Sequence, residues 1–229
     1  MEIKDTKIFG IGFHKTGTTS LGKALSCLGY RVHGGVTSNI ACTKEEAKKK
    51  AKKLCKSHDA LQDMPWPILY RWFDKEYKDS KFILTVRNKD DWIKSVCKHF
   101  GNRNIKRHKW IYGKADPIGN EKLYLKRYKK HNKNVREYFK NRIGKDLIVV
   151  NITKGDGWKK ICGFLGDKEP KIPFPKSNVS YEKWEKYDTK NKLRHYLHNV
   201  FYETTSKYRS AMKSFRRGNL IKRVRRKMK

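Results

Sequence analysis

Short apolar runs alternate with amphipathic stretches along most of this chain. The runs have the length and composition of strands, and the stretches between them repeat apolar residues at the spacing of three and four that is typical of helices. The strands are predicted at residues 8–11, 30–33, 59–62, 81–86 and 147–150, and the helices at residues 20–28, 43–57, 66–77, from 90 onward, 121–142, 158–165 and 188–215. Because strands that alternate with helices imply parallel βαβ units, we expect an α/β fold with a central, mostly parallel sheet flanked by helices.

Two parts of the chain do not follow this pattern. Residues 101–120 contain Gly, Asn, Arg, His and aromatic residues without periodicity, which predicts a long loop of the kind that is usually functional in a compact domain. Residues 216–229 hold eight Lys or Arg residues in fourteen positions and predict a basic C-terminal tail. The length of 229 residues otherwise suits a single domain, which we expect to cover residues 1–215.

A glycine-rich loop between the first strand and the first helix is the main candidate for chemistry. Residues 12–19, GFHKTGTT, lead from a buried strand into a helix N-terminus, where free backbone N–H groups and the helix dipole can receive an anion. Glycines let the backbone approach such a ligand, a lysine supplies positive charge, and hydroxyls supply donors. The candidate anion-binding residues are His14, Lys15, Thr16, Gly17, Thr18, Thr19 and Ser20.

The spacing of this loop differs from that of nucleotide triphosphatases. Their Walker A loop, G-x-x-x-x-G-K-[ST], carries a lysine directly after the second glycine. Here Gly12 and Gly17 have the right separation, but the lysine, Lys15, lies between them. The clearest downstream strand, residues 82–86, is followed by Arg87 and not by an aspartate suited to Mg²⁺. The loop therefore indicates the binding of a different anion without a metal.

Two motifs, in this order, resemble those of sulfotransferases that use 3′-phosphoadenosine 5′-phosphosulfate (PAPS). The run HKTGTTSL is similar to the family's 5′-phosphosulfate loop, P-K-[TS]-G-T-[TS], with His14 in place of the usual proline. The run FILTVRNKDDWIKS, residues 82–95, is similar to the family's strand, Arg, helix, Ser block. Its interval of eight residues from Arg87 to Ser95 is the family's interval. The resemblance covers about residues 7–178.

This resemblance implies a donor, a reaction and a set of binding residues. Residues 15–19 would hold the 5′-phosphosulfate of PAPS, and Arg87 with Ser95 would hold the 3′-phosphate, which stays on the product nucleotide PAP. The sulfuryl group would pass by metal-free in-line displacement to a hydroxyl or amine of an acceptor, with Lys15 stabilising the leaving oxygen. The predicted loop at 101–120 would cover a small-molecule or carbohydrate acceptor, and its His, Arg and Trp residues suit an anionic one.

The general base for the acceptor has two candidates at predicted strand ends. Asp63, in Asp63-Met64-Pro65, resembles the His-x-Pro turn of the catalytic histidine in cytosolic sulfotransferases, with Asp in place of His. His33 lies where the heparan-modifying branch carries its catalytic glutamate. An aspartate with a pKa near 4 suits this role only if burial raises its pKa, and surrounding positive charge lowers it. We rank Asp63 first and His33 second. The structural alternatives are a helix cap for Asp63 and a polar turn residue for His33.

Two other functions stay open on the residues alone. The net charge of +35, from 57 Lys and Arg against 22 Asp and Glu, attracts polyanions. The chain could therefore be a catalytically silent polyanion-binding protein on the same fold. A second alternative is an ATP-dependent P-loop kinase, against which the displaced lysine argues. The charge also predicts non-specific binding of nucleic acid, although the sequence contains no zinc finger or RNA-recognition signature.

Cysteine usage and hydropathy indicate a compartment. The five cysteines form no C-x-x-C pair, and their odd number suits reduced thiols. The N-terminus has no apolar secretory segment, and no run of about 18 apolar residues occurs. We therefore expect a cytoplasmic protein without a transmembrane segment.

Three further predictions are structural. His131 falls on the apolar stripe of the helix at residues 121–142, so we expect it in or beside the core and not in catalysis. Asp90 is expected to cap the helix that carries Ser95. Thr43, with Glu46 three residues later, predicts a capping box for the lysine-rich second helix, whose lysines we expect to face solvent.

Overall fold

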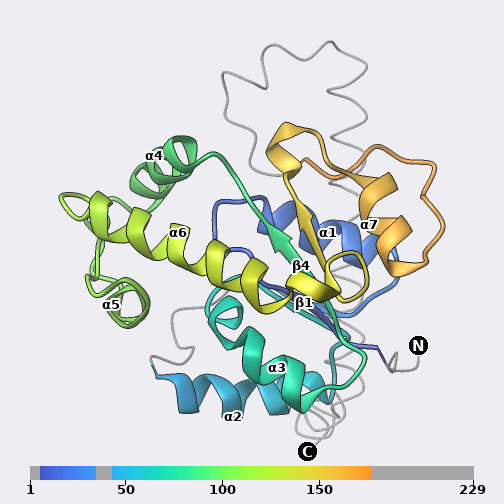
Figure 1. Cartoon of the computed structure of the whole chain (residues 1–229). Coiled ribbons are helices and arrows are strands. Elements are labelled where there is room, and N and C mark those ends of the chain that lie inside the picture. Colours follow the sequence, from blue (N-terminus) through green and yellow to red (C-terminus); the bar gives the residue numbers. More distant parts are fainter. Residues whose placement is uncertain (1–5, 35–42, 177–229) are drawn as a thin grey trace, which may run out of the picture. The chain divides into compact units, whose positions relative to one another are not determined.

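A sheet of five parallel strands lies at the centre of the described part of the protein (Figure 1). In this computed structural model the described residues are 6–34 and 43–176. The strands have the spatial order β2-β3-β1-β4-β5. They are β1 (Ile8–Gly10), β2 (Val32–His33), β3 (Ala60–Gln62), β4 (Lys81–Thr85) and β5 (Leu147–Val150). The predicted α/β class and the parallel sheet are confirmed.

The position of β1 explains where a site can form. Strand β1 pairs with β3 on one side and with β4 on the other, so the chain fills one half of the sheet before it crosses to the second half. In the register, Phe9 lies opposite Leu61 in β3 and Phe82 in β4. A change of direction of this kind opens a crevice at the carboxyl ends of the strands, next to β1.

Helices cover both faces of the sheet. Helices α2, α3 and α6 pack on one face, and α1 and α7 pack on the other (Figure 1). The helices are α1 (Thr18–Cys27), α2 (Lys44–Cys55), α3 (Tyr70–Glu76), α4 (Lys89–Phe100), α5 (Lys106–Tyr112), α6 (Glu121–Tyr138) and α7 (Trp158–Leu165), with short 3₁₀ turns η1 (Trp66–Leu69), η2 (Lys140–Arg142) and η3 (Ile152–Lys154).

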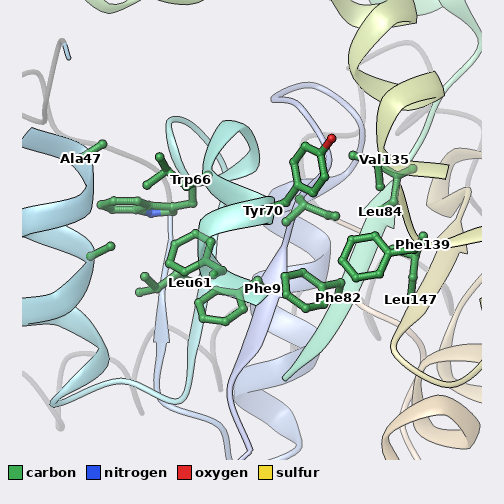
Figure 2. Packing of buried hydrophobic residues seen from close by; sticks show 14 of the residues in the cluster. Phe9, Ala47, Leu61, Trp66, Tyr70, Phe82, Leu84, Val135, Phe139 and Leu147 are labelled. Carbon is green, nitrogen blue, oxygen red and sulfur yellow. The ribbon is translucent and has the colours of Figure 1, made fainter. Parts of the chain in front are cut away.

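The alternation of side chains along the strands divides the core into two layers. In β1, Ile8 packs against the α1 and α7 side, whereas its neighbour Phe9 packs against the α2, α3 and α6 side. Figure 2 shows the layer on the α2, α3 and α6 side, in which Phe9 and Phe82 lie between Leu61 and Phe139. The Phe9 and Phe73 rings stack with their centroids 3.9 Å apart. Both faces of the sheet are therefore buried, as the apolar composition of β1 and β5 requires.

A third cluster of buried residues lies away from these two layers, where α4, α5 and α6 meet. It is rich in aromatic side chains and includes one residue of the loop after β1. Its members are Phe13, Met64, Trp92, Ile93, Val96, Ile111, Tyr112, Tyr124 and Tyr128. We call this group the aromatic block. It connects the loop after β1 to the segment that follows β4.

The structure corrects two of the predictions and confirms two others. Residues 101–120 are not one long loop, because they contain α5, whose buried face carries His108, Ile111 and Tyr112. Asp90 does not cap α4. The cap is the Asn88 side chain, which accepts hydrogen bonds from the backbone N–H groups of Asp90 and Asp91. The capping box of α2 is present as predicted. The core position predicted for His131 is confirmed, since its side chain is buried and its Nε2 lies 2.7 Å from the carbonyl oxygen of Ile11.

The predicted boundary at residue 215 stays a prediction. The described residues all lie within one compact unit, Met1–Ser177. The helix predicted at 188–215 and the basic tail predicted at 216–229 both lie outside the described residues.

Candidate functional site

The loop after β1 passes so close to β4 that it requires a glycine. A Cβ atom added to Gly12 would overlap the backbone and the hydroxyl of Thr85. The Thr16 hydroxyl lies 2.6 Å from the Thr85 hydroxyl and donates to the Phe13 carbonyl oxygen, also at 2.6 Å, and the residue is fully buried. Because its hydroxyl is used inside the protein, Thr16 can offer only its backbone to a ligand. The hydrogen bond between the Thr16 and Thr85 hydroxyls thus holds the loop against β4.

The same loop leads into the N-terminus of helix α1. Gly17 precedes α1 with a φ of 98°, a left-handed conformation that favours glycine, and as the N-cap residue it has no side chain to cap the helix. The N-cap residue therefore supplies no acceptor to the first backbone N–H groups of α1, and N–H groups at a helix N-terminus can bind an anion. Of the hydroxyl residues that begin this helix, Thr19 is exposed, whereas Thr18 and Ser20 are buried.

Lys15 and Asp63 lie at the carboxyl ends of neighbouring strands and share an unusual backbone conformation. Lys15 has a φ of 64° and Asp63, directly after β3, has a φ of 68°. Neither residue is glycine, so each conformation costs on the order of 1–3 kcal/mol. Strain of this kind persists where the surrounding structure fixes a residue in one orientation, and it concentrates at functional sites. These two residues are candidates for catalysis on this ground as well as by motif.

The environment of Asp63 ties it to the loop and alters its acidity. Its carboxylate accepts a hydrogen bond from the Met64 backbone N–H at 2.8 Å and another from the Thr18 hydroxyl. Burial raises the pKa of Asp63 above the usual aspartate value, although these hydrogen bonds and the charges of Arg107 and Lys15 oppose the shift. The concern that positive charge would keep this carboxylate too acidic for a base is therefore answered by burial.

Lys15 is shifted in the opposite direction. Burial lowers the pKa of Lys15, and the nearby positive charge of Arg87 lowers it further, while Asp63 partly compensates. The cost of holding this charge is relieved when an anion approaches, because an anion favours the charged form of the lysine. The arrangement therefore favours an anionic ligand beside Lys15.

Arg87 follows β4 and reaches toward the same loop. Its Nη1 donates to the Lys15 carbonyl oxygen at 3.3 Å. Its Nε is buried and has no hydrogen-bond partner among the described residues. A buried guanidinium donor without a partner is costly in a folded protein, and a bound phosphate would satisfy it. Ser95, eight residues later, lies half-buried on α4.

The His14 side chain packs against the aromatic block. Its Nε2 lies 3.0 Å from the Tyr112 hydroxyl, and its ring centroid is 5.2 Å from that of His108 on α5. Its carbonyl oxygen accepts a hydrogen bond from Trp92 Nε1 at 2.9 Å. Burial, reinforced by His108 and Arg107, lowers the pKa of His14 well below the usual histidine value. His14 can therefore offer its backbone to a ligand, while its neutral ring packs against Tyr112 and His108 and so holds the loop in place.

The structure separates the two candidates for the general base. The His33 ring lies edge-on to Trp66, with centroids 5.9 Å apart, and to His58, at 5.4 Å. Both neighbours lie beside β3 and not in the loop after β1. Asp63, by contrast, contacts Thr18 and acts electrostatically on Lys15. The structure therefore brings Asp63 together with the loop.

Several residues of the site were not assigned a role from the sequence. Tyr112 and Arg107 lie in α5, which shows no apolar periodicity in the sequence. Trp92 and Tyr128 lie on regular apolar stripes, where an aromatic residue is most simply explained as core. The one sequence feature that could have indicated a role for Trp92 is its position between Arg87 and Ser95.

A family model described as a sulfotransferase domain matches the chain in two overlapping stretches, residues 7–121 and 105–183. Together they span residues 7–183, or 177 of the 229 residues. The chain belongs to the sulfotransferase domain family. The matched part of this sulfotransferase includes the loop after β1, Asp63 and Arg87. A search of curated proteins gave no match.

Two properties of the sulfotransferase concern membranes and metals. None of the helices within residues 6–34 and 43–176 is long and apolar enough to cross a membrane. In the same residues, no group of three or more His, Cys, Asp or Glu side chains is placed to hold a metal ion. The residues that gather at the carboxyl edge of the sheet are chiefly cations, with Asp63 as a carboxylate among them.

Proposed function

We propose that this sulfotransferase uses PAPS as its donor and transfers the sulfuryl group to a hydroxyl or amine of an acceptor. The observation that carries the proposal is the meeting of Lys15, Asp63 and Arg87 at the carboxyl edge of the sheet, beside the N-terminus of α1. Each of these residues lies at the end of a different strand. Chain segments far apart in the sequence thus converge on one anion-binding edge.

The residues present fit a nucleotide with phosphates at two positions. Residues 15–19 would hold the 5′-phosphosulfate through backbone N–H groups, the Lys15 ammonium and the Thr19 hydroxyl. Thr18 would contribute its backbone N–H, because its hydroxyl donates to Asp63. Arg87 and Ser95 would hold the 3′-phosphate, and the unpartnered Nε of Arg87 supports this assignment. When bound, PAPS would supply an activated sulfuryl group for the acceptor, with PAP as the leaving group.

Lys15 would act on the charge that grows during transfer. Negative charge accumulates on the leaving oxygen as sulfuryl transfer proceeds in line. A lysine ammonium that is already desolvated interacts with this charge more strongly than one in water, and it needs no reorganisation at the moment of reaction. The lowered pKa of Lys15 reflects the same desolvation.

Asp63 would accept the proton of the acceptor hydroxyl. A carboxylate with a raised pKa is a stronger base than an ordinary aspartate and takes a proton more readily. The Thr18 hydroxyl and the Met64 N–H hold the carboxylate in one orientation. His33 remains the second candidate by resemblance, and its contacts with Trp66 and His58 give it less support.

Helix α5 would form part of the acceptor side. It packs on His14 through Tyr112 and His108, and the Arg107 charge acts on Asp63. This positive charge near the proposed base supports a small-molecule or carbohydrate acceptor that carries an anionic group. The basic surface supports non-specific nucleic-acid binding as a side property, since charge attraction needs no base-specific contact. Placement in the cytoplasm is proposed on the sequence alone.

The test is transfer of label from PAPS to candidate acceptors. The protein is incubated with PAPS labelled in the sulfuryl group and with panels of hydroxyl and amine compounds, neutral and anionic, and the sulfated product is identified. We expect a labelled product that forms without added divalent metal. A protein that binds PAP but yields no product with any panel would favour the silent polyanion-binding alternative. Transfer from ATP with Mg²⁺ would favour the kinase.

A further inference from the structure

Tyr128 makes a pair of hydrogen bonds to the backbone of one residue, Arg87. Its hydroxyl accepts a hydrogen bond from the Arg87 N–H at 2.9 Å and donates one to the Arg87 carbonyl oxygen, also at 2.9 Å. Asn132, one turn further along α6, also hydrogen-bonds to this hydroxyl. Tyr128 is almost fully buried, with 2% of its surface exposed. A phenol has one donor and two acceptor positions, so all of them are used.

These two hydrogen bonds hold Arg87 at a point where the backbone hydrogen bonds of the sheet have ended. The last backbone bond between β4 and its neighbour is the one from Val86 N–H to the Val150 carbonyl oxygen, at 2.9 Å. Arg87 follows directly, before α4 begins at Lys89, so it lies in neither a strand nor a helix. Holding the N–H and the C=O of one residue fixes its φ and ψ, and thereby the direction in which its side chain leaves the backbone.

The ring of Tyr128 also fixes the helix that carries Ser95. It stacks on Trp92 of α4 with centroids 4.2 Å apart and planes inclined by 9°. Trp92 lies three residues before Ser95, about one turn away on the same helix. One side chain of α6 therefore contacts the backbone of Arg87 and the helix that presents Ser95. These are the two parts of the proposed 3′-phosphate site.

We infer that Tyr128 is a positioning residue for the 3′-phosphate of the nucleotide, acting through the backbone of Arg87. The inference rests on the proposed function, because that function assigns the 3′-phosphate to Arg87 and Ser95. Tyr128 does not need to touch the ligand. Its hydroxyl sets where the guanidinium lies, and its ring sets how far α4 lies from Arg87. Both bonds go to the Arg87 backbone and neither goes to Lys15 at the 5′-phosphate site, whose carbonyl oxygen accepts from Arg87 Nη1.

The test compares two single-hydroxyl deletions. Tyr128→Phe keeps the ring and its stacking on Trp92 but removes both bonds to Arg87. Tyr138→Phe is the matched control on the same helix, since the Tyr138 hydroxyl donates to Asp74 Oδ2 at 2.7 Å and belongs to a separate ion-pair group with Arg142. Calorimetry measures the affinities of PAP and AMP, which differ in the 3′-phosphate, for the wild type and both variants.

We expect Tyr128→Phe to weaken PAP roughly five- to twentyfold and to change AMP less than about twofold, because a charge-assisted contact is lost only where a 3′-phosphate is present. Tyr138→Phe should leave the ratio of the two affinities unchanged. A structural effect alone would weaken both nucleotides together. In an Arg87→Gln background, Tyr128→Phe should cause no further change in the ratio, because Tyr128 acts through Arg87.

Three outcomes would overturn the inference. The first is an unchanged ratio in Tyr128→Phe, and the second is an equal loss of PAP and AMP. The third is a Tyr128→Phe protein that does not fold, which would make the hydroxyl a requirement of the core. A wild type that binds PAP and AMP equally would instead refute the proposed donor site itself, so the two failures can be told apart.

Discussion

The two ends of the proposed donor site are supported by different chemistry. The loop with Lys15 rests on three buried histidines: His14 lies in the loop, His108 packs against it, and His131 bonds to the Ile11 carbonyl oxygen just before it. Arg87 rests on Tyr128, whose ring is stacked on Trp92. The first support is made of imidazoles whose pKa values burial lowers, whereas the second contains no imidazole.

The difference extends to the backbone. The loop end contains two non-glycine residues at positive φ, Lys15 and Asp63, and both have a pKa displaced by burial. The Arg87 end shows no such conformation, and two ordinary hydrogen bonds to its backbone hold it. Strain and buried charge accompany the residues to which we assign bond making and breaking. Plain hydrogen bonding accompanies the residues to which we assign recognition.

The largest expected effect separates Asp63 from His33. Asp63→Asn keeps the size of the side chain but removes the base, so turnover with labelled PAPS should fall roughly a thousandfold. PAP affinity should stay within about threefold of the wild type, since the change leaves the anion-binding groups in place. His33→Ala should retain turnover within about threefold. Loss of turnover in His33→Ala with retention in Asp63→Asn would reverse the ranking of the two bases.

The activity should also depend on pH through Asp63. Transfer requires the carboxylate form, so the rate should fall as pH drops through the pKa of Asp63. Burial raises that pKa, so the acid limb of the rate profile should lie at higher pH than the ordinary aspartate value of about 4. An acid limb at or below the ordinary value would remove Asp63 from this role.

A smaller effect on the rate is expected at Lys15. The ammonium matters most when the leaving oxygen carries charge, so Lys15→Ala should lower kcat about a hundredfold and raise the PAPS KM less than about tenfold. Lys94→Ala, an exposed lysine next to Ser95 on α4, is the matched control and should change neither constant. A near-normal kcat in Lys15→Ala would contradict the assignment. A rise in KM alone would make Lys15 a binding residue.

The sequence alone predicts the site residues at the strand ends but not the residues that support them. The loop, Arg87 and Asp63 could be identified because each stands at the end of an apolar run and belongs to a motif with fixed spacing. Helix α5 could not, because its buried residues His108 and Tyr112 are polar enough to hide its periodicity. Asp63 is half-buried, and the desolvation that decides the direction of its pKa shift arises from tertiary packing that spacing does not encode. The same is true of Tyr128, whose role depends on contact with Arg87 across 41 residues of sequence.

The fourth expected effect concerns the stability of the fold and is specific to the loop end. Burial lowers the pKa of His108 to about 3 and that of His131 to about 4, so both stay neutral in the folded protein while the unfolded chain takes up protons below about pH 6.5. Stability should therefore fall as pH drops below that value. At pH 5, about 1.5 units below it, each of the two histidines should cost about 2 kcal/mol relative to pH 8.

Urea unfolding at a series of pH values checks this sign and size. In His131→Phe, the loss of stability between pH 8 and pH 5 should be about 2 kcal/mol smaller than in the wild type, whatever the variant does to stability at pH 8. Tyr128→Phe should show the wild-type dependence, because it removes a hydroxyl and leaves every histidine in place. An equal slope in His131→Phe and the wild type would mean that this histidine is not held neutral, and the contrast between the two ends would fail there.

The central claim, a donor site with one end for each phosphate, is tested most directly by comparing PAP with AMP. The two nucleotides share the 5′-phosphate and the adenosine, so they differ only in what Arg87 and Ser95 are proposed to hold. Isothermal titration calorimetry of the wild-type protein should show PAP binding at least about tenfold more tightly than AMP, as one charge-assisted phosphate contact requires. Equal affinities for PAP and AMP would contradict the assignment of Arg87 and Ser95 to the 3′-phosphate.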